Sequence, residues 1–272
     1  MGGHSQAILQ SSGPAGRLLG LDRDRDALAF AGARLAPFGE RVMLAHAPFS
    51  RIAATFAAHG LGSAAGILAD LGVSSPQLDR AERGFSFQRT GPLDMRMDQS
   101  SGETAADLVA RLGERELTGI LRDLGEERFA GRIARRIVEA RQRAPLDTTG
   151  ELAAVVAHAV PSRERHKNPA TRTFQALRLA VNRELDELAT FLADAPGLLG
   201  PGGRLCIISF HSLEDRMVKR RFRALAEPRP EVPGDQPKFQ VVTRRIVEAS
   251  EAEQQRNPRS RSAKLRVLER IA

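Results

Sequence analysis

Tryptophan and tyrosine are absent from this 272-residue chain, and cysteine occurs once. Without those aromatic residues, stacking on a nucleic-acid base or an adenine ring would fall to the 12 phenylalanines or to arginine planes. The single Cys206 cannot form an internal disulfide, and its apolar neighbours indicate a buried thiol in a reducing compartment. We therefore expect a cytoplasmic protein rather than a disulfide-stapled secreted one.

Long hydrophobic runs are also missing. No stretch approaches the ~20 apolar residues of a membrane helix, and the first residues lack the charged-then-apolar pattern of a secretion signal. A membrane partner is therefore not expected. With 42% hydrophobic and 27% charged residues, the composition is that of a globular chain that can bury a core.

Acidic residues are outnumbered by basic ones, 33 against 41, which gives a formal net charge of +8. Such a balance favours a polyanionic partner such as RNA or DNA. Most of the basic residues are arginine, which a GC-rich genome would also produce. Charge alone therefore leaves nucleic-acid binding open.

Short apolar runs alternate with helical patterns over roughly the first 70 residues. Strands that alternate with helices predict crossover units and a parallel sheet. The expected strands are residues 17–22, 41–46 and 66–70, and the expected helices are residues 24–35 and 52–59.

The alternation stops after residue 77. Residues 77–98 are irregular and rich in glycine, proline, methionine and phenylalanine, and residues 102–160 show only helical periodicity, as in a helical insertion. A long helix is expected from Pro169 to about Ala193. The α/β pattern then resumes with expected strands at 204–210, 239–243 and 264–271, and a helix at 212–225.

The opening glycines, Gly2 and Gly3, suit a sharp turn that leaves free N–H groups facing a ligand. In doubly wound sheets, an acid about 20 residues beyond such a turn accepts the ribose hydroxyls. Asp22 ends the first expected strand at nearly that separation. Its alternative role is to cap the helix that follows.

Two later strand ends share the same predicted edge of the sheet. Phe49 follows the second strand and could cover an adenine, although a lone phenylalanine is more often part of a core. Asp70 ends the third strand and is followed by glycine and two serines. A buried strand rarely ends in so polar a turn unless the turn satisfies a ligand or a backbone.

These segments together resemble the small-subunit ribosomal RNA methyltransferase H (MraW) family. The most specific match is the block DLGVSSPQLDRAERGFSFQRTGPLDMRMD at residues 70–98. The others are GGHSQAIL at 2–9, GLDRD at 20–24, GEERFAGRIARRIVEAR at 125–141, HKNPATRTFQALRLAVN at 166–182, GGRLCIISFHSLEDRMVK at 202–219 and NPRSRSAKLRVLER at 257–270. They cover most of the chain in order.

The resemblance implies an α/β fold, the class I methyltransferase (Rossmann-like) mostly parallel sheet, with an inserted all-helical substrate-recognition domain. The expected division is a first part of the methyltransferase domain at residues 1–98, the insertion at 99–167 and a second part at 168–272. Family members carry a strand before the glycine pair. This sequence lacks that first strand, so we expect the flanking strands to lose a hydrogen-bonding neighbour.

The resemblance also implies S-adenosylmethionine as the cofactor and the transfer of its methyl group to the exocyclic N4 of a cytidine in the decoding region of 16S rRNA. The residues implied to bind the cofactor are Gly2, Gly3, His4, Asp22, Phe49, Asp70 and Gln77. Spacing alone had already selected Gly3, Asp22 and Asp70.

The cytosine amine is a poor nucleophile because its lone pair is delocalised into the ring. An acceptor aimed at its N–H bonds would favour reaction, and Asp70, Ser74 or a backbone carbonyl could serve. The alternative is that Asp70 only binds cofactor. His211 beside Ser212 lacks the nucleophile elbow of a hydrolase, and the six histidines show no metal-ligand spacing, so no metal is expected.

RNA contact is expected on the basic insertion and its flanks, where arginine and lysine could meet phosphates. The residues are Arg132, Arg135, Arg136, Arg163, Arg165, Lys167 and Arg172. Their alternative is a solvated face with partners such as Glu126 and Glu127. The expected partner is 16S rRNA or the small ribosomal subunit, and a homodimer is left open. Two rival functions remain, a non-catalytic RNA-binding or ribosome-assembly factor and a nicotinamide dehydrogenase.

Overall fold

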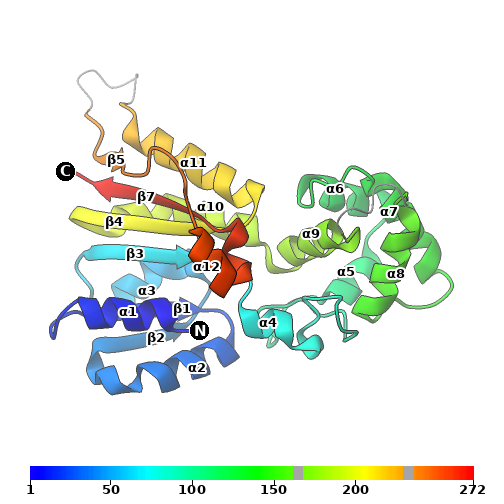
Figure 1. Cartoon of the computed structure of the whole chain (residues 1–272), viewed down its shortest axis with the longest axis horizontal. Helices are drawn as coiled ribbons and strands as arrows, with labels where there is room; N and C mark the ends of the chain where they lie inside the picture. Colours follow the sequence, from blue (N-terminus) through cyan, green and yellow to red (C-terminus); the bar gives the residue numbers. More distant parts are fainter. Residues whose placement is uncertain (162–167, 229–235) are drawn as a thin grey trace. The chain divides into compact units, whose positions relative to one another are not determined.

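The computed structural model describes residues 1–161, 168–228 and 236–272 (Figure 1). The chain forms two compact units, one made of Met1–Gly72 with Leu185–Ala272 and the other of Val73–Glu184. The second unit extends beyond the expected insertion of residues 99–167 at both ends. Its core explains why, because Phe85 and Met95 before the insertion and Phe174 after it join the same buried cluster.

The first unit begins with helices and strands in alternation. The helices are α1 (Gly3–Ser11), α2 (Arg25–Leu35) and α3 (Ile52–Ala58), the strands are β1 (Leu18–Asp22), β2 (Val42–His46) and β3 (Ala64–Asp70), and the 3₁₀ turns are η1 (Ala36–Arg41) and η2 (Phe49–Arg51). Strands β1 and β2 pair in parallel, from Leu18 opposite Val42 to Asp22 opposite His46.

The second segment of this unit completes another sheet. Its elements are α10 (Glu184–Asp194), η5 (Ala195–Leu198), β4 (Leu199–Ser209), α11 (Ser212–Ala226), β5 (Phe239–Val241), β6 (Val247–Glu248), α12 (Glu251–Arg256), η6 (Pro258–Ser262) and β7 (Lys264–Arg270). The strand order is β3-β4-β7-β5, with β6 paired to β7. Strands β3 and β4 are parallel, whereas β7 is antiparallel to β4. The architecture is thus the expected mixed α/β, Rossmann-like one.

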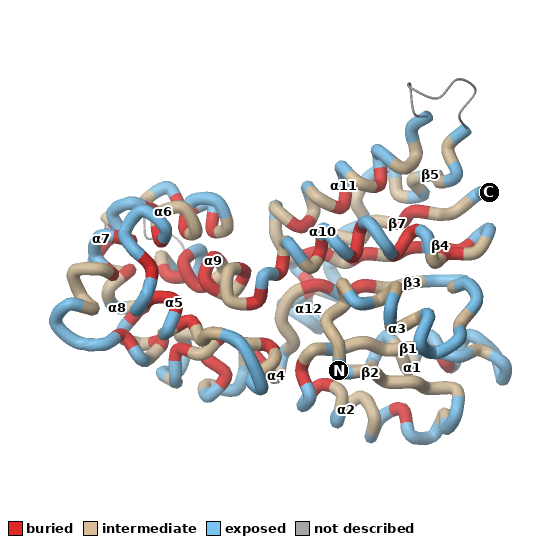
Figure 2. The backbone as a smooth tube through the Cα atoms, turned by 180° about the vertical axis from the view of Figure 1, so that it is seen from behind, coloured by how far each residue is buried: buried red, intermediate tan, exposed pale blue. Residues whose placement is uncertain are grey.

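Apolar side chains on β4, α10 and α11 form the core of the first unit. Leu205 and Ile207 on β4 are fully buried, and Phe191 of α10 and Phe222 of α11 pack in the same cluster. Figure 2 shows the buried positions running along β4 and α10. Cys206, expected to be buried, is half-buried, because alternate residues of a strand face opposite sides of the sheet.

Strand pairing in this unit is interrupted between β1 and β3. Within the described residues, β1 and β2 form one sheet and β3 belongs to the other. In the part of the chain that the structure describes, strand β1 pairs only with β2, and β3 pairs only with β4, so each of these two strands has a neighbour on one side only, as expected. Strand β4 begins at Leu199, five residues before the strand expected at residues 204–210.

The second unit is helical. Its helices are α4 (Ser75–Asp79), α5 (Ala105–Arg111), α6 (Glu114–Asp123), α7 (Ala130–Arg141), α8 (Thr149–Ala159) and α9 (Ala170–Asn182), with the 3₁₀ turn η3 at Ala81–Arg83. Capping boxes begin α5 at Thr104 and α8 at Thr148. Leu117 of α6, Ile133 of α7 and Leu152 of α8 are fully buried.

The irregular segment 79–104 of this unit is held by buried polar side chains. Asn182 Oδ1 accepts from Met97 N at 2.8 Å, and Asn182 Nδ2 donates to Met95 O at 2.7 Å. The buried Arg83 donates through Nη2 to the carbonyl of Met97 at 3.0 Å. A Cβ on Gly91 would clash with the backbone of Ala81. These constraints fix a segment that has no regular pattern in the sequence.

The long helix expected from Pro169 to about Ala193 is wrong, because α9 ends at Asn182 and α10 begins at Glu184. Arg183 lies between them with a φ of 50°, in the left-handed region. The Arg178 side chain makes an ion pair with Glu184, with Nε to Oε1 at 2.7 Å. The left-handed Arg183 thus separates α9 from α10, and the Arg178–Glu184 pair accompanies the break. No helix in the described part of the chain is long and apolar enough to cross a bilayer.

Candidate active site

Polar side chains collect at the carboxyl ends of the strands in the first unit. Strand β1 ends at Asp22, β2 at His46 and β3 at Asp70, and Figure 1 shows the N-terminus at this same edge. His4, in the first turn of α1, lies with Nδ1 3.6 Å from Asp70 Oδ2. The structure therefore joins the start of the chain to the end of β3, as a shared ligand site requires.

The start of α1 leaves backbone donors available. Gly2 precedes the helix with a φ of 75° and no side chain caps it. A Cβ at Gly2 would lie 3.3 Å from the Ala31 Cα, so both the backbone conformation and the close approach of α2 require glycine. Arg34 of α2 donates to the Met1 carbonyl at 2.9 Å and holds this turn in place. Free N–H groups at a helix N-terminus favour an anionic group.

Asp22 is positioned by the turn between β1 and α2. Its Oδ1 accepts from Asp24 N at 2.9 Å. Asp24, not Asp22, is the N-cap of α2, since its side chain accepts from Asp26 N. Desolvation raises the pKa of Asp22 above its ordinary value, and the Asp24 carboxylate adds to that rise, while backbone hydrogen bonds oppose it. The carboxylate is thus available for a hydroxyl-bearing ligand.

Asp70 has a pKa raised above its ordinary value. Desolvation is the main cause, the carboxylate of Glu214 adds to it, and His4 opposes it. The His4 and Asp70 side chains are 58% and 44% exposed, so their attraction is weakened by solvent. A carboxylate perturbed by both burial and a neighbouring acid is typical of a functional site.

The sequence places Glu214 in the polar segment after β4, beside the Asp70 site, but does not single it out as an acid that acts on Asp70. Glu214 lies in the first turn of α11, and its Oε2 accepts from Phe210 N at 3.0 Å. His211 is the N-cap of α11, and its Nε2 lies 3.2 Å from Glu214 Oε1, with both side chains almost fully buried. Among the residues that the structure describes, the His211 Nε2 has no hydrogen-bond partner. Glu214 is one of the polar residues that follow β4, and polar residues after a parallel strand are the signal by which Asp70 was selected.

Phe49 lies against the core of the first unit. Its ring contacts Phe191 edge to face, with the ring centroids 5.4 Å apart. The residue is half-buried and begins η2 directly after β2. Contact between Phe49 and an adenine stays a prediction.

Ser74 and Gln77 belong to the second unit and form the capping box of α4. Gln77 Oε1 accepts from Ser74 N at 2.9 Å, and Ser74 Oγ accepts from Gln77 N at 3.4 Å. The two side chains therefore have a structural role at the start of a short helix. Their catalytic and cofactor-binding roles stay predictions.

The arginines expected to contact RNA differ in their partners. On α7, Arg135 lies 3.6 Å from Glu114 and Arg136 pairs with Glu139 at 2.8 Å, whereas Arg132 has no side-chain partner among the described residues. Arg172 donates to the Glu126 carbonyl. Arg163, Arg165 and Lys167 lie outside the described residues. RNA binding by this set stays a prediction.

The part of the chain that the structure describes holds no cluster of histidine, cysteine and acidic residues able to bind a metal ion. Asp215, which follows Glu214 on α11, is engaged elsewhere, in a bidentate pair with Arg266 at 2.7 and 3.0 Å. His211 and Ser212 are therefore not accompanied by a free acid at Asp215. The acid beside His211 is Glu214 instead.

Comparison with known proteins identifies close relatives of the chain. The chain is 54% identical to "Ribosomal RNA small subunit methyltransferase H" of Thioalkalivibrio sulfidiphilus over 281 residues, covering 100% of this chain and 88% of that protein. Proteins of the same name from Geobacter sp. strain M21 and Methylococcus capsulatus are 53% and 51% identical, covering 99% and 100% of this chain and 89% and 92% of theirs.

The profile of one family, described as the MraW methylase family, matches residues 1–271, nearly the whole chain. This match confirms the resemblance seen in the sequence motifs, and with it the class I methyltransferase fold class. The chain belongs to the MraW methylase family.

Proposed function

We propose that the protein transfers a methyl group from S-adenosylmethionine to small-subunit ribosomal RNA. The proposed acceptor is the exocyclic N4 of a cytidine in the decoding region of 16S rRNA. Membership of a methylase family and the printed names of relatives at 54% and 53% identity support the coarser statement. The observation that carries the proposal within the molecule is the meeting of the α1 start with Asp70, where His4 Nδ1 lies 3.6 Å from Asp70 Oδ2.

The residues at this edge fit the proposed cofactor. The uncapped start of α1 at Gly2 and Gly3 offers N–H donors to its carboxylate, and Asp22 offers an acceptor to its ribose hydroxyls. Asp70 and His4, 3.6 Å apart at the same edge, are the proposed contacts of its charged amino acid group if Asp70 only binds cofactor. When bound, S-adenosylmethionine supplies a methyl group on a positively charged sulfur. Phe49 and Gln77 are the further proposed contacts.

Asp70 is the proposed acceptor for the N4 amino group. A carboxylate that accepts an N–H hydrogen bond favours the tetrahedral geometry in which the nitrogen lone pair becomes nucleophilic. During transfer the nitrogen–carbon bond forms, the carbon–sulfur bond breaks, and one amine proton passes to an acceptor or to water. Ser74 is the weaker alternative, because its hydroxyl already accepts from Gln77 N in the cap of α4.

The arginines of the second unit are the proposed RNA contacts. Arg132 is the best placed of them to meet a phosphate, because no carboxylate of the described residues neutralises it. Arg135 and Arg136 would first have to exchange Glu114 and Glu139 for phosphate. Such contacts position the RNA without reading its sequence.

Single-turnover transfer of a labelled methyl group tests the proposal. Purified protein is mixed with labelled S-adenosylmethionine and either free 16S rRNA or small ribosomal subunits, and the RNA is digested to nucleosides for mass spectrometry. We expect N4-methylcytidine with one of the two substrates. Methylation at another atom would refute the N4 assignment.

The variant Asp70→Asn separates the two roles of Asp70. It keeps the size of the side chain and removes its charge, so a large loss of rate with unchanged S-adenosylhomocysteine affinity supports the acceptor role. Full turnover with unchanged affinity refutes it. RNA binding without any methyl transfer by the wild type would instead favour the non-catalytic assembly factor, and spectral changes with NADH would favour the dehydrogenase.

A further inference from the structure

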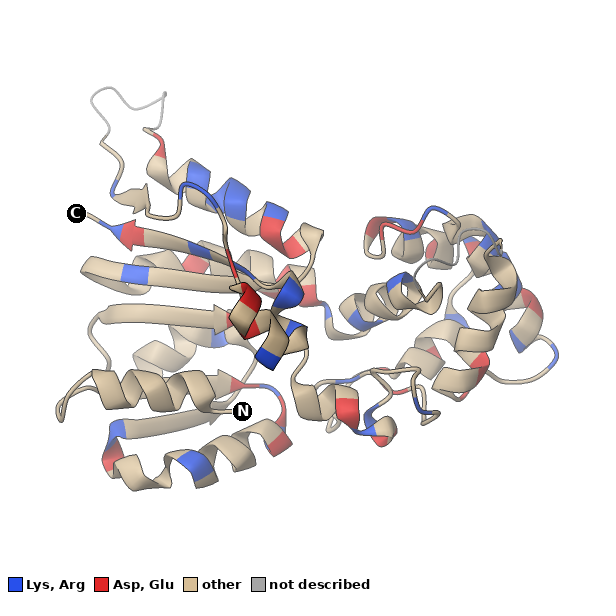
Figure 3. Cartoon of the chain, viewed as in Figure 1, with Lys and Arg blue, Asp and Glu red and all other residues tan. Residues whose placement is uncertain are grey.

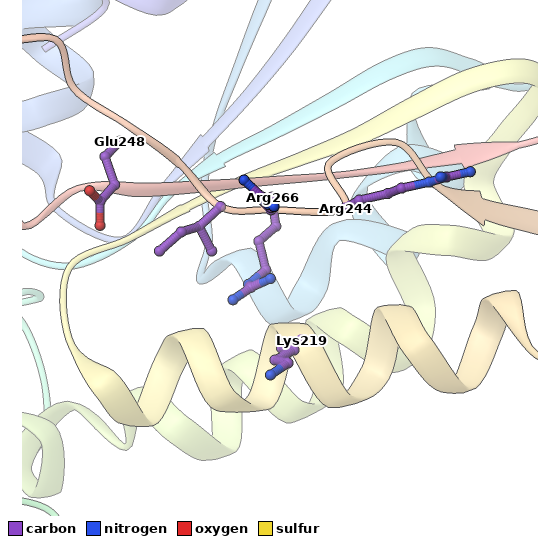
Figure 4. A pocket seen from close by; sticks show the side chains of 6 residues that line it. Lys219, Arg244, Glu248 and Arg266 are labelled. Carbon is purple, nitrogen blue, oxygen red and sulfur yellow. The ribbon is translucent and has the colours of Figure 1, made fainter.

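A basic recess lies in the first unit, lined by side chains that the proposed cofactor site does not use. It has a volume of about 600 Å³ and is lined by Lys219, Arg244, Arg245, Ile246, Glu248 and Arg266. These residues come from α11, from β7 and from the segment that joins β5 to β6 and ends in β6 itself. Figure 4 shows Lys219 on α11, with the Arg266 side chain extending from β7 toward that helix.

The floor of this recess is neutral. Arg266 makes two hydrogen bonds to Asp215 of α11, from Nε at 2.7 Å and from Nη2 at 3.0 Å. Both side chains are largely buried, at 11% and 16% exposure. The pair therefore fixes α11 against β7 and contributes no net charge to a ligand.

The rim carries the unbalanced charge. Lys219, Arg244 and Arg245 are exposed, and none of them has a side-chain hydrogen bond or ion pair within the described residues. Glu248 is the only carboxylate among the residues that line the recess. Figure 3 shows further basic residues along α11. Three cations against one acid around a concave surface suit an anionic ligand with several charges.

We propose that this recess binds the phosphate backbone of the RNA substrate. This inference rests on the proposed function, which supplies an RNA to be bound. It adds to the arginines of the second unit a separate site on α11 and the β5–β6 segment. Unpaired arginine and lysine side chains on a surface position a phosphate chain, and each phosphate neutralised releases counterions. Ile246 offers an apolar surface between the cations for a ribose or base edge.

The salt dependence of RNA binding tests the proposal. Affinity of the full chain for a fluorescein-labelled 16S rRNA transcript is measured by anisotropy over a series of salt concentrations. The double variant Arg244→Gln, Arg245→Gln should bind more weakly. The slope of the logarithm of the binding constant against the logarithm of the salt concentration should be smaller in magnitude by about 1.4 to 1.8. Each phosphate that the variant leaves without a cation removes about 0.7 to 0.9 from this slope.

A matched control and an opposite change sharpen the test. Arg223→Gln removes one positive charge from α11, outside the recess, and Arg223 is already paired with Glu227 at 2.6 Å, so the slope should stay that of the wild type. Glu248→Gln removes the carboxylate from the recess and should strengthen binding a few fold. Equal weakening by Arg223→Gln and by the double variant, or weaker binding by Glu248→Gln, would overturn the proposal.

Failure of this inference is distinguishable from failure of the proposed function. If the wild type transfers methyl groups but the double variant keeps the wild-type slope, the recess does not bind RNA and the proposed function still stands. If the slope changes as expected but the wild type transfers no methyl group, the recess binds RNA and the proposed function is wrong. The wild type could instead bind anionic phospholipid vesicles, and the double variant could lose that binding while its slope with RNA stays unaltered. That result would assign the recess to a lipid surface and would contradict RNA binding there.

Discussion

Single residues at strand ends could be identified from the sequence because their role follows from position alone. A carboxylate that ends a parallel strand lies at the ligand edge of the sheet, so Asp22 and Asp70 were found without any knowledge of packing. Glu214 was not found as the acid that raises the pKa of Asp70. Glu214 follows β4, which pairs in parallel with β3, so the rule that selects Asp70 also marks its segment, but the effect of Glu214 on the pKa of Asp70 is visible only in three dimensions.

The raised pKa of Asp70 predicts a gain in stability when its charge is removed. Because the pKa is higher in the folded chain than its ordinary value of 3.8, the ionised form is disfavoured on folding. The resulting loss of stability is present above the folded pKa and disappears below the ordinary one. Asp70→Asn should therefore melt at a higher temperature than the wild type at pH 7.

Thermal melting over a pH series checks this prediction. The difference between Asp70→Asn and the wild type should shrink as the pH falls toward 4. Asp123→Asn is the control, because its hydrogen bonds from Arg122 lower the pKa of Asp123 and its neutralisation should give no gain. A lower melting temperature for Asp70→Asn at pH 7 would contradict the assignment.

Gly2 and Gly3 are adjacent but differ in what they tolerate. A Cβ at Gly2 is strained by the φ of 75° and by Ala31, whereas a Cβ at Gly3 meets only the end of the Arg34 side chain, at 3.6 Å. A left-handed conformation disfavours alanine by about 1–2 kcal/mol. In Gly2→Ala the turn must adopt this conformation at that cost in order to bind, so the affinity for S-adenosylhomocysteine should fall about tenfold. Calorimetric titration of both variants checks this. Equal affinities for Gly2→Ala and Gly3→Ala would show that the turn does not hold the ligand.

Elements with strong periodicity were predicted correctly, and their boundaries less so. Strands β1, β2 and β3 and the helices of the second unit follow the apolar pattern of the sequence. The two-residue β6 was not predicted, because it pairs only through its contact with β7. The break at Arg183 was missed for a related reason, since a left-handed arginine carries no local signal and the Arg178–Glu184 pair that accompanies it is visible only in three dimensions.

Asn182 at the end of α9 is predicted to stabilise the segment that precedes α5. Asn182→Leu keeps the volume but leaves Met97 N and Met95 O buried without a partner. Each such group costs about 1–3 kcal/mol, so the free energy of unfolding should fall by roughly 2–6 kcal/mol.

Urea denaturation and amide hydrogen exchange measure this effect. The Met97 amide should exchange faster in Asn182→Leu. Gln99→Leu, on the same segment, loses one exposed hydrogen bond to Asp94 and should change the unfolding free energy far less. If both variants lose the same stability, Asn182 does not organise the segment.

At the scale of the whole molecule, the sequence predicted the interruption of the α/β pattern and its return, but not the bounds of the compact units. The second unit takes in Val73–Glu184 because the irregular segment and α9 share a core with α5–α8. Those contacts join residues nearly a hundred positions apart, which periodicity cannot reveal. The role of this unit in substrate recognition stays a prediction.

The central claim is that the start of α1, the end of β1 and the end of β3 hold one ligand, S-adenosylmethionine. Hydrogen exchange of the full chain with and without S-adenosylhomocysteine tests it most directly. We predict slower exchange in three peptides, those that contain Gly3, Asp22–Asp24 and Asp70–Gly72. Unchanged exchange in all three under saturating ligand would contradict the account.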